Sequence, residues 1–413
     1  MPLSRNCLAI ALGAGAILNF AGCDGNTTGP ARGPAFTSVI VGENHSCALA
    51  EDGIAFCWGF NISGQLGDGA NVNRDRPVRV AGDQRFASLT GGINHTCGIT
   101  AGGVLYCWGR NSEGQLGDGT TQDRSVPVRV NTGLRFDAVA GGGLHTCGLA
   151  SGRAYCWGSG SSGQLGNSES GVRTLYTAPV PVSGNLGFVS LSALGSHTCG
   201  ITVDGTAYCW GSDAAGTLGT LASETCPDGL SNLLPCSAVP VPVVFPLAFT
   251  AVSAGVAHTC ALAINGAAYC WGRNLLGQLG DGTNLSSPVP RPVSGGLQLV
   301  HIRVGNSHSC GLTAAGSAYC WGGNHRGQLG NGSTLDASEP APVSGGIDFV
   351  ELSVGGAHTC GRDSAGLVYC WGQNGDGELG YEPPDLCSDV PCSHTPNPVR
   401  VDPALLPSRA PGR

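Results

Sequence analysis

Short apolar stretches, separated by glycine, proline and polar residues, recur in a fixed order of four along residues 36–403. The first reads F-x-x-V/L, as at residues 36–39, and the second reads H-S/T-C-x-L/I. The third is an aromatic residue followed by C-W-G, and the fourth is P-V-x-V, as at residues 77–80. Short runs of this kind, rich in β-branched and aromatic residues and bounded by turn residues, are typical of strands. We therefore predict four short strands per unit.

The unit repeats with a step of about 50 residues, stretched to 52 and 61 in two places. Each second stretch begins with a histidine: His45, His95, His145, His197, His258, His308 and His358. The seven tryptophans all fall in the third stretch. Four-stranded units repeated at such a period indicate a propeller, in which closing the ring protects the sheet edges. The predicted fold is all-β, a seven-bladed β-propeller spanning residues 36–405.

The cysteines of each unit mirror one another across a predicted hairpin. Cys47 and Cys57 are symmetric about residue 52, so residues 51–53 would form a three-residue loop whose Gly53 suits the left-handed position. The third unit is one residue shorter and predicts a two-residue turn at residues 151–152. Directly opposed side chains approach to within about 4.5–5.5 Å, close enough for a disulfide. Alternation along the strands also places His45 and Cys47 on the sheet face of Cys57.

Two insertions carry one further close cysteine pair each. We predict nine disulfides: Cys47–Cys57, Cys97–Cys107, Cys147–Cys156, Cys199–Cys209, Cys226–Cys236, Cys260–Cys270, Cys310–Cys320, Cys360–Cys370 and Cys387–Cys392. Metal binding is the alternative, but each unit offers two cysteines and one histidine, whereas a structural zinc site takes four ligands. We therefore expect no metal site and no cofactor. So many locally paired cysteines indicate an oxidising compartment.

Composition narrows the choice of partners. The chain has 69 glycines and 25 prolines at repeat-locked positions, which indicates many turns rather than disorder. Only 12% of the residues are charged and the formal net charge is -8. The basic residues are scattered arginines, without the basic stripe that a nucleic-acid-binding protein usually shows. We therefore expect no nucleic-acid partner.

The N-terminal segment has the features of an export signal. Arg5 precedes an apolar run, and residues 20–23 read F-A-G-C, which resembles the lipobox of bacterial lipoproteins. The resemblance implies that residues 1–22 are removed and that Cys23 is lipidated. The alternative is an ordinary signal peptide cut near Ala21. With Cys23 lipidated, we predict that residues 23–35 form a flexible tether; residues 406–413 are predicted to be a disordered tail. We expect a monomer in the bacterial cell envelope, outside the cytoplasm, attached to the membrane only through the lipid.

The repeat H-S/T-C-x-L…Y-C-W-G-x-N-x-x-G-Q-L-G closely resembles that of the regulator of chromosome condensation family. The GQLG core is kept at Gln65, Gln115, Gln164, Gln278 and Gln328, whereas Thr217 and Glu378 depart from it. The resemblance covers nearly all of residues 36–403 and implies a seven-bladed propeller. The family's namesake is a guanine-nucleotide exchange factor for a nuclear GTPase, a partner that an exported chain would not meet. Exchange activity is therefore kept only as an alternative that rests on family membership.

No catalytic motif stands out, and a residue repeated seven times is not a catalytic one, so we expect the repeat histidines to be structural and hydrogen-bonded inside their blades. Insertions at residues 223–240 and 382–398, and a longer loop at 167–181, should share one rim. Loops on a rigid scaffold carry function. The candidate binding residues on this rim are Arg74, Arg76, Arg124, Tyr176, Leu233, Leu234, Tyr381 and Asp385. We expect a non-enzymatic scaffold that binds a protein or glycan there, or alternatively an enzyme inhibitor or enzyme acting at the same face.

Overall fold

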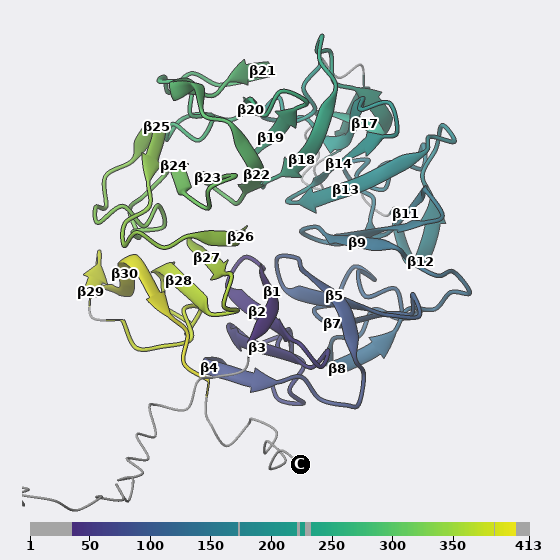
Figure 1. Ribbon diagram of the computed structural model, residues 1–413. Helices are drawn as coiled ribbons and strands as arrows, with labels where there is room; N and C mark the ends of the chain where they lie inside the picture. The colour runs from purple at the N-terminus through teal and green to yellow at the C-terminus, as the bar shows by residue number, and fades with distance from the viewer. Residues whose placement is uncertain (1–34, 172–173, 221–223, 228–232, 384, 402–413) are drawn as a thin grey trace, which may run out of the picture. The chain divides into compact units, whose positions relative to one another are not determined.

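The computed structural model describes residues 35–171, 174–220, 224–227, 233–383 and 385–401 (Figure 1). The expected signal segment 1–22, Cys23, the tether up to residue 34 and the tail 406–413 lie outside the described residues. Within those residues, no helix is long and apolar enough to cross a membrane.

The described residues form seven antiparallel sheets, the blades, each built from one contiguous stretch of chain (Figure 1). Four short strands per repeat form because the apolar stretches are brief and most end at glycine-containing turns; apart from β17 and β30, which the insertions lengthen, these strands have four to seven residues. Blade 1 has β1 (Phe36–Val41), β2 (His45–Ala50), β3 (Ala55–Gly59) and β4 (Arg74–Arg79). Blade 2 has β5 (Phe86–Gly91), β6 (His95–Thr100), β7 (Leu105–Gly109) and β8 (Arg124–Arg129). Blade 3 has β9 (Ala138–Gly141), β10 (His145–Ala150), β11 (Arg153–Ser159) and β12 (Leu175–Pro181).

Blades 4 and 7 carry a fifth strand at the outer edge, formed by the two insertions. Blade 4 has β13 (Phe188–Leu194), β14 (His197–Thr202), β15 (Ala207–Ser212), β17 (Leu233–Pro242) and, outermost, β16 (Glu224–Pro227). Blade 5 has β18 (Phe249–Ala254), β19 (His258–Ala263), β20 (Ala268–Gly272) and β21 (Ser287–Pro292), followed by the 3₁₀ turn η1 (Ser294–Gly296). Blade 6 has β22 (Leu299–Val304), β23 (His308–Thr313), β24 (Ala318–Gly322) and β25 (Ala337–Pro342). Blade 7 has β26 (Phe349–Val354), β27 (His358–Asp363), β28 (Val368–Gln373), β30 (Val390–Pro398) and, outermost, β29 (Asp385–Cys387).

The ring closes without exchange of a strand between the chain ends. The first strand of each blade contacts the first strands of both neighbours, and β26 of the last blade contacts β1 (Figure 1). The backbone N–H of Val41 donates to Ser353 Oγ at 2.9 Å, and the N–H of Phe36 donates to the carbonyl oxygen of Gly366 at 3.0 Å. Blade 7 is complete in itself. The seam between first and last blade is therefore a side-chain and loop contact of the same kind as the other six.

The hydrophobic core consists of seven clusters, one at each boundary between neighbouring blades. At the first boundary, Cys47, Cys57 and Leu66 of blade 1 pack against Phe86 and Trp108 of blade 2. All seven tryptophans are fully buried in this way. Both faces of every blade are thus apolar because both are covered by another blade, as the alternation of Cys57 and Trp58 predicts.

The middle hairpin of each blade has the predicted register. Cys47 lies directly opposite Cys57, and Gly53 closes the loop with φ of 78°. In blade 3 the loop is a two-residue turn with both residues left-handed, Ser151 at φ 51° and Gly152 at φ 75°. The structure contains disulfides at all nine predicted pairs. Each of the seven hairpin bridges joins two strands of one blade, so none links one blade to the next.

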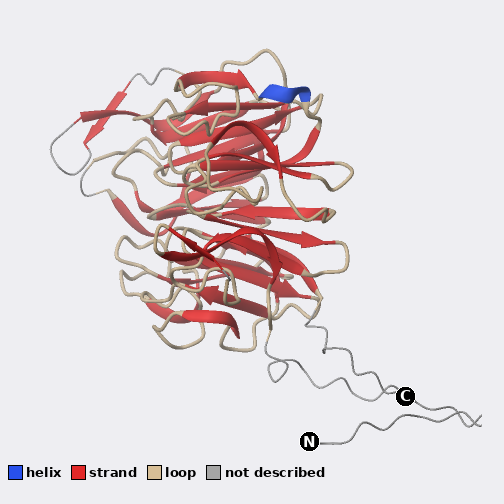
Figure 2. Ribbon diagram, turned by 90° about the vertical axis from the view of Figure 1, so that its left-hand side faces the viewer, coloured by secondary structure: helices blue, strands red, loops and turns tan. Residues whose placement is uncertain are grey.

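The propeller has two unlike faces. The turns between second and third strands and the start of β1 lie on one, which we call the hairpin face. The other carries the loops between first and second strands and the long loops between third and fourth strands, which include both insertions; we call it the insertion face. Figure 2 shows the ring edge-on, with η1 and the short turns on the right and the longer loops on the left. The insertions thus share one face, as predicted.

Candidate binding face

The seven repeat histidines form hydrogen bonds across the blade boundaries. Each donates from Nε2 to a serine or threonine hydroxyl of the next blade at 2.7–2.9 Å, and His358 of the last blade reaches Ser46 of the first. We expected these histidines to bond inside their own blades, and that expectation was wrong. A sequence pattern shows which sheet face a side chain occupies, but not what the neighbouring blade presents to it.

The hydroxyl groups fix the protonation state of the histidines. Thr96 Oγ1, for example, donates its proton to the carbonyl oxygen of Gln65 at 2.8 Å, so it can only accept from His45 Nε2. His45 Nε2 therefore carries a proton. Burial, with smaller contributions from His358 and His95, lowers the pKa of His45 to about 3. The ring is therefore neutral at ordinary pH: its Nε2–H is donated within the core, and its Nδ1 lone pair has no hydrogen-bond partner in the described structure. That lone pair is fully buried, so a metal or a proton relay would have no access to it from the surface.

The GQLG loops also form hydrogen bonds across the blade boundaries. The indole N–H of Trp58 donates to the backbone oxygen of Glu378 at 2.8 Å, and five of the other tryptophans reach the equivalent carbonyl. Upstream, Asn61 organises its loop: its side-chain oxygen accepts from the N–H of Leu66 at 2.9 Å and its amide donates to Asp68 at 3.1 Å. The recurring GQLG motif therefore joins neighbouring blades through these hydrogen bonds.

Two of the predicted rim arginines belong to these loops. Arg74 pairs with Asp68 at 2.7 Å, and Arg124 pairs with Asp118 at 2.8 Å. Hydrogen bonds from Thr120 and Arg124 hold the pKa of Asp118 below its usual value, although burial alone would raise it. Arg76, in contrast, is exposed on β4. Of the three rim arginines, Arg74 and Arg124 are thus paired with loop carboxylates, and in the described structure only the Arg76 guanidinium has no such ion pair.

The remaining rim candidates lie in different environments. Leu233 and Leu234 are exposed on β17, with exposed fractions of 66% and 38%. Tyr176 donates its hydroxyl to Glu169 at 2.6 Å. Tyr381 is not a surface residue: it is buried, its hydroxyl donates to the backbone oxygen of Cys370 at 2.9 Å, and burial raises its pKa to about 12. Tyr381 follows Gly380 where other repeats have a loop residue such as Asp68, and its ring fills the blade 7–blade 1 boundary instead.

The rim candidates do not come together in one place. Tyr176, Leu233 and Leu234 lie in blades 3 and 4, whereas Asp385 lies in blade 7 and Arg76 in blade 1. In Figure 1 the outer strands of blades 4 and 7 stand on different sides of the ring. The insertions are therefore two separate projections from one face rather than the walls of a single cleft.

The mouth of the central channel on the insertion face is formed by seven short loops between first and second strands. The described loops are joined by backbone hydrogen bonds, as from the N–H of Gly356 to the oxygen of Glu43 at 2.9 Å. Glu43 is the one ionisable side chain in these seven loops, all of which are described. Burial raises its pKa. A single carboxyl among glycine, aliphatic, amide and serine residues does not form a pair of acid and base groups.

Sequence reasoning missed a row of exposed aliphatic side chains on the insertion face. These residues, which we call the aliphatic arc, are Ile62, Val72, Leu275, Leu285, Leu335 and Leu386. Their exposed fractions run from 56% to 77%, and they occupy blades 5, 6, 7 and 1, which are consecutive around the ring. A signal was present: Val72, Leu285 and Leu335 occupy the same loop position in three repeats, where a polar residue would be expected. They were overlooked because they lie within the repeats rather than in the insertions.

Seven antiparallel blades in a ring define the protein as a seven-bladed β-propeller. The sequence matches the RCC1-like domain over residues 133–407 and the Regulator of chromosome condensation (RCC1) repeat over residues 52–99 and 102–149. The chain belongs to the RCC1 repeat family. Its nine disulfides indicate an extracytoplasmic, oxidising location.

Three solved structures illustrate the fold. Human WBSCR16 is 22% identical, with a TM-score of 0.70, and the match covers 80% of this chain and 88% of that one. Prp20p from Saccharomyces cerevisiae, described with its binding properties to Gsp1p and histones, is 23% identical, with 77% and 80% covered and a TM-score of 0.67. The ectodomain of the Physcomitrella patens receptor kinase CR4 is 21% identical, with 81% and 72% covered and a TM-score of 0.51. At these identities the likeness shows the shared fold.

Proposed function

We propose that this protein is a non-enzymatic, envelope-anchored scaffold that binds a protein partner through its insertion face. The observation that carries the proposal is the aliphatic arc. Six large aliphatic side chains, each more than half exposed, stand on consecutive blades of that face. Exposed apolar side chains on one face of a rigid scaffold offer surface that a protein partner can cover. Burying them against a partner would contribute roughly 25 cal/mol for each Å² of apolar surface covered.

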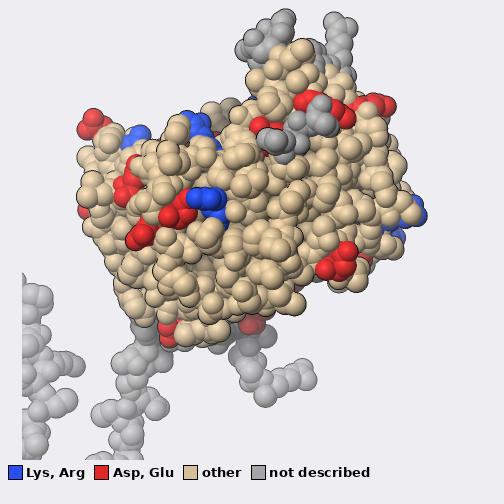
Figure 3. Space-filling view, turned by 90° about the horizontal axis from the view of Figure 1, so that it is seen from above, with Lys and Arg blue, Asp and Glu red and all other residues tan. Residues whose placement is uncertain are grey.

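The chemistry of the arc favours a protein over a glycan. The large apolar side chains that are exposed in the described residues are leucine, isoleucine and valine, without a tryptophan, tyrosine or phenylalanine among them. Charged side chains are sparse, at 12% of the residues, and Figure 3, which views the ring from its edge, shows acidic and basic side chains scattered over that edge. An aliphatic surface gains free energy chiefly by burial against another apolar surface, as in the cores of protein interfaces. A protein with an apolar groove or helix face fits this surface.

The proposed anchor fits this use of the insertion face. A lipid on Cys23 would hold the protein at a membrane without using the side chains of the insertion face. The disulfides support location outside the cytoplasm, and the F-A-G-C stretch at residues 20–23 supports lipidation. Replacing Cys23 with serine should release the protein from the membrane fraction; retention there would contradict a lipid anchor.

The alternatives make different demands on the same face. An enzyme would need converging ionisable groups, and the lone Glu43 at the channel mouth weighs against one there. An enzyme inhibitor would use the arc in the same way as a scaffold, with an enzyme as the partner. Guanine-nucleotide exchange would rest on family membership alone, because the likeness to Prp20p is one of fold.

The test compares two faces of the same protein. Cross-linking in intact envelopes would be followed by purification of the wild type, of an arc variant (Val72→Glu, Leu285→Glu, Leu335→Glu) and of a hairpin-face control. The control carries Val203→Glu and Ile264→Glu, because these residues are exposed by 82% and 70% on the opposite face. We expect the same cross-linked protein with the wild type and control, and its loss with the arc variant. Equal recovery from all three would refute the arc as the binding site, and inhibition of a captured enzyme would favour the inhibitor alternative.

A further inference from the structure

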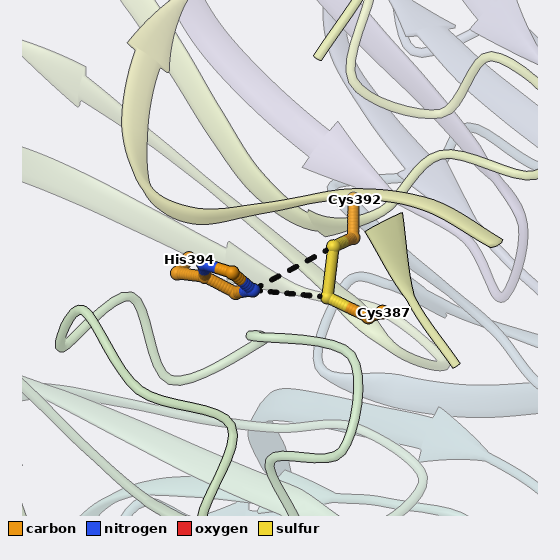
Figure 4. A group of neighbouring side chains, drawn as sticks. All are labelled: Cys387, Cys392 and His394. Carbon is orange, nitrogen blue, oxygen red and sulfur yellow. Dashed lines mark hydrogen bonds between the residues drawn. A yellow bond between two sulfur atoms is a disulfide. The ribbon is translucent and has the colours of Figure 1, made fainter. Parts of the chain in front are cut away.

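A histidine faces one of the nine disulfides in the insertion of blade 7. His394 Nε2 lies 3.2 Å from Cys387 Sγ and 3.8 Å from Cys392 Sγ, as Figure 4 shows. On the other side of the ring, His394 Nδ1 lies 3.5 Å from Asp385 Oδ2. The three Cys and His donor atoms lie within 4.8 Å of one another, which would suit a metal, but the sulfurs are bonded to each other and offer no thiolate. The arrangement is that of a disulfide with an oriented imidazole beside it.

The position of this bridge differs from that of the seven hairpin bridges. β29 is a three-residue strand at the outer edge of its sheet, joined to β30 by a turn in which Ser388 and Asp389 both have positive φ. Cys387 lines an open groove of about 530 Å³ together with His325, Ser333, Leu386 and His394. Arg326 of blade 6 donates to the backbone oxygens of Cys387 and Ser388. Both cysteines of this bridge are buried, as are those of the hairpin bridges, but the bridge lies at the outer edge of its sheet and Cys387 lines the groove.

Blade 4 supplies a matched counterpart that lacks the histidine. Its insertion carries the Cys226–Cys236 bridge at the same place, between the outermost strand and the next. Glu224 lies opposite Cys236 there, as Asp385 lies opposite Cys392 in blade 7. The residue two after the second cysteine is Ala238 in blade 4 and His394 in blade 7. The two bridges thus share their strand positions and an acidic residue opposite the second cysteine, and they differ in the imidazole and in the separation of the two cysteines, 10 residues in blade 4 against 5 in blade 7.

We propose that Cys387–Cys392 is an exchangeable disulfide, reduced by a dithiol protein that enters the groove, and that His394 stabilises the thiolate released from it. A thiolate of the partner attacks Cys387 Sγ, the S–S bond breaks, and its electron pair leaves on Cys392 Sγ. The second thiol of the partner then attacks the mixed disulfide and releases Cys387 as a thiolate. The partner is oxidised to a disulfide, and the cysteine pair, with the two protons the partner gives up, becomes a dithiol. This inference does not depend on the proposed binding partner of the aliphatic arc.

Graded reduction of the intact protein tests the proposal. The full chain is equilibrated with increasing ratios of reduced to oxidised dithiothreitol, quenched with acid and alkylated, and each cysteine pair is followed by peptide mass spectrometry. We expect Cys387–Cys392 to be half-reduced at a ratio at least tenfold lower than Cys226–Cys236. His394→Ala should remove most of that difference, and Ala238→His should make the blade 4 bridge easier to reduce. Equal reduction of the two bridges in the wild type would overturn the proposal.

A second measurement separates an effect on the thiolate from a change in packing. In a Cys392→Ser variant, Cys387 has no partner, and its rate of alkylation by iodoacetamide at pH 7 reports the fraction present as thiolate. We expect His394→Ala in that background to slow alkylation about tenfold, because the imidazole no longer stabilises the anion. In a Cys236→Ser variant, Cys226 should be alkylated as slowly as Cys387 is without His394. Adding Ala238→His to that variant should speed the alkylation of Cys226. Unchanged rates in both swaps would exclude a role for His394 in the chemistry.

Discussion

His358 in the last blade donates its Nε2–H to the hydroxyl of Ser46 in the first, at 2.9 Å. This bond across the seam repeats the contact that His95 makes with Thr146 in the middle of the chain, also at 2.9 Å. The two ends of the chain are therefore joined by the same interaction that joins any two neighbouring blades.

Replacing His358 with alanine should lower the free energy of unfolding by about 2–3 kcal/mol, through a lost hydrogen bond and a cavity in a packed boundary. His145→Ala should have a similar effect, because its bond to Thr198 is equivalent. Urea unfolding followed by tryptophan fluorescence measures both, with the exposed His325→Ala as the control. A much smaller loss at His358 than at His145 would show that the seam is not equivalent to the other boundaries.

The seven buried repeat histidines should make the folded protein less stable in acid. Burial lowers the pKa of five of the seven histidines to about 3 and of His95 and His197 to about 4, against an ordinary value of 6.5 in the unfolded chain. The unfolded state binds protons that the folded state does not, so the stability is complete above about pH 6.5 and falls as the pH drops toward 4. The carboxyls of Glu43, Glu351, Asp376 and Glu378, whose pKa values burial raises, act in the opposite direction but are four groups against seven histidines.

The slope of the unfolding free energy against pH checks this prediction. Near pH 5 the slope should correspond to an uptake of several protons on unfolding, up to seven from the ring. Replacing His308 with asparagine should reduce the uptake by about one proton. A slope of less than one proton between pH 6 and 4.5 would mean that the histidines are not held neutral in the folded protein.

A glycine of the GQLG motif should tolerate no side chain. Gly67 has φ of 70°, and a Cβ there would lie 2.6 Å from the indole nitrogen of Trp108 in the next blade. Gly67→Ala should therefore cost about 2–4 kcal/mol through a strained backbone and a clash. Gly102→Ala is the control, because a Cβ at Gly102 meets no atom within 4 Å. Thermal unfolding of the two variants should separate them clearly; equal melting temperatures would be inconsistent with the packing of the motif against Trp108.

The hairpin bridges should stabilise blades without holding the ring together. Replacing Cys147 and Cys156 with alanine should lower the free energy of unfolding by about 2–3 kcal/mol, chiefly through the unfolded state. The variant should keep the elution volume of the wild type, because the bridge joins strands of one blade only. Intact mass before and after reduction gives the number of bridges, at two hydrogens each. Fewer than nine in the oxidised protein would contradict the structure.

Much of the fold follows from the sequence because it repeats. The mirrored positions of Cys47 and Cys57 give the strand register, and the alternation of Cys57 and Trp58 gives the two faces of a blade. What a neighbouring blade offers is a tertiary property that periodicity does not contain, which is why the partner of His45 was misplaced.

The candidate site was harder to predict for the same reason. Tyr381 starts an insertion and looks exposed in the sequence, yet it fills a gap at the seam and hydrogen-bonds to Cys370. Val72 and Leu335 look like ordinary repeat residues, yet they stand at the surface because their loops turn on buried Asn61 and Asn324, which bond to their backbone oxygens. Exposure of a loop residue depends on how its loop is folded, which the residue type alone does not show.

In every one of the nine bridges a cysteine is joined to the next cysteine along the described chain. A chain that meets an oxidant progressively, from its N-terminal end, would acquire each native pair as soon as the second cysteine of that pair arrives. Neighbour-by-neighbour oxidation, which gives wrong pairs in proteins with interleaved bridges, here gives the right ones. We therefore expect oxidation of the chain to reach the native pairs with little need for a disulfide isomerase.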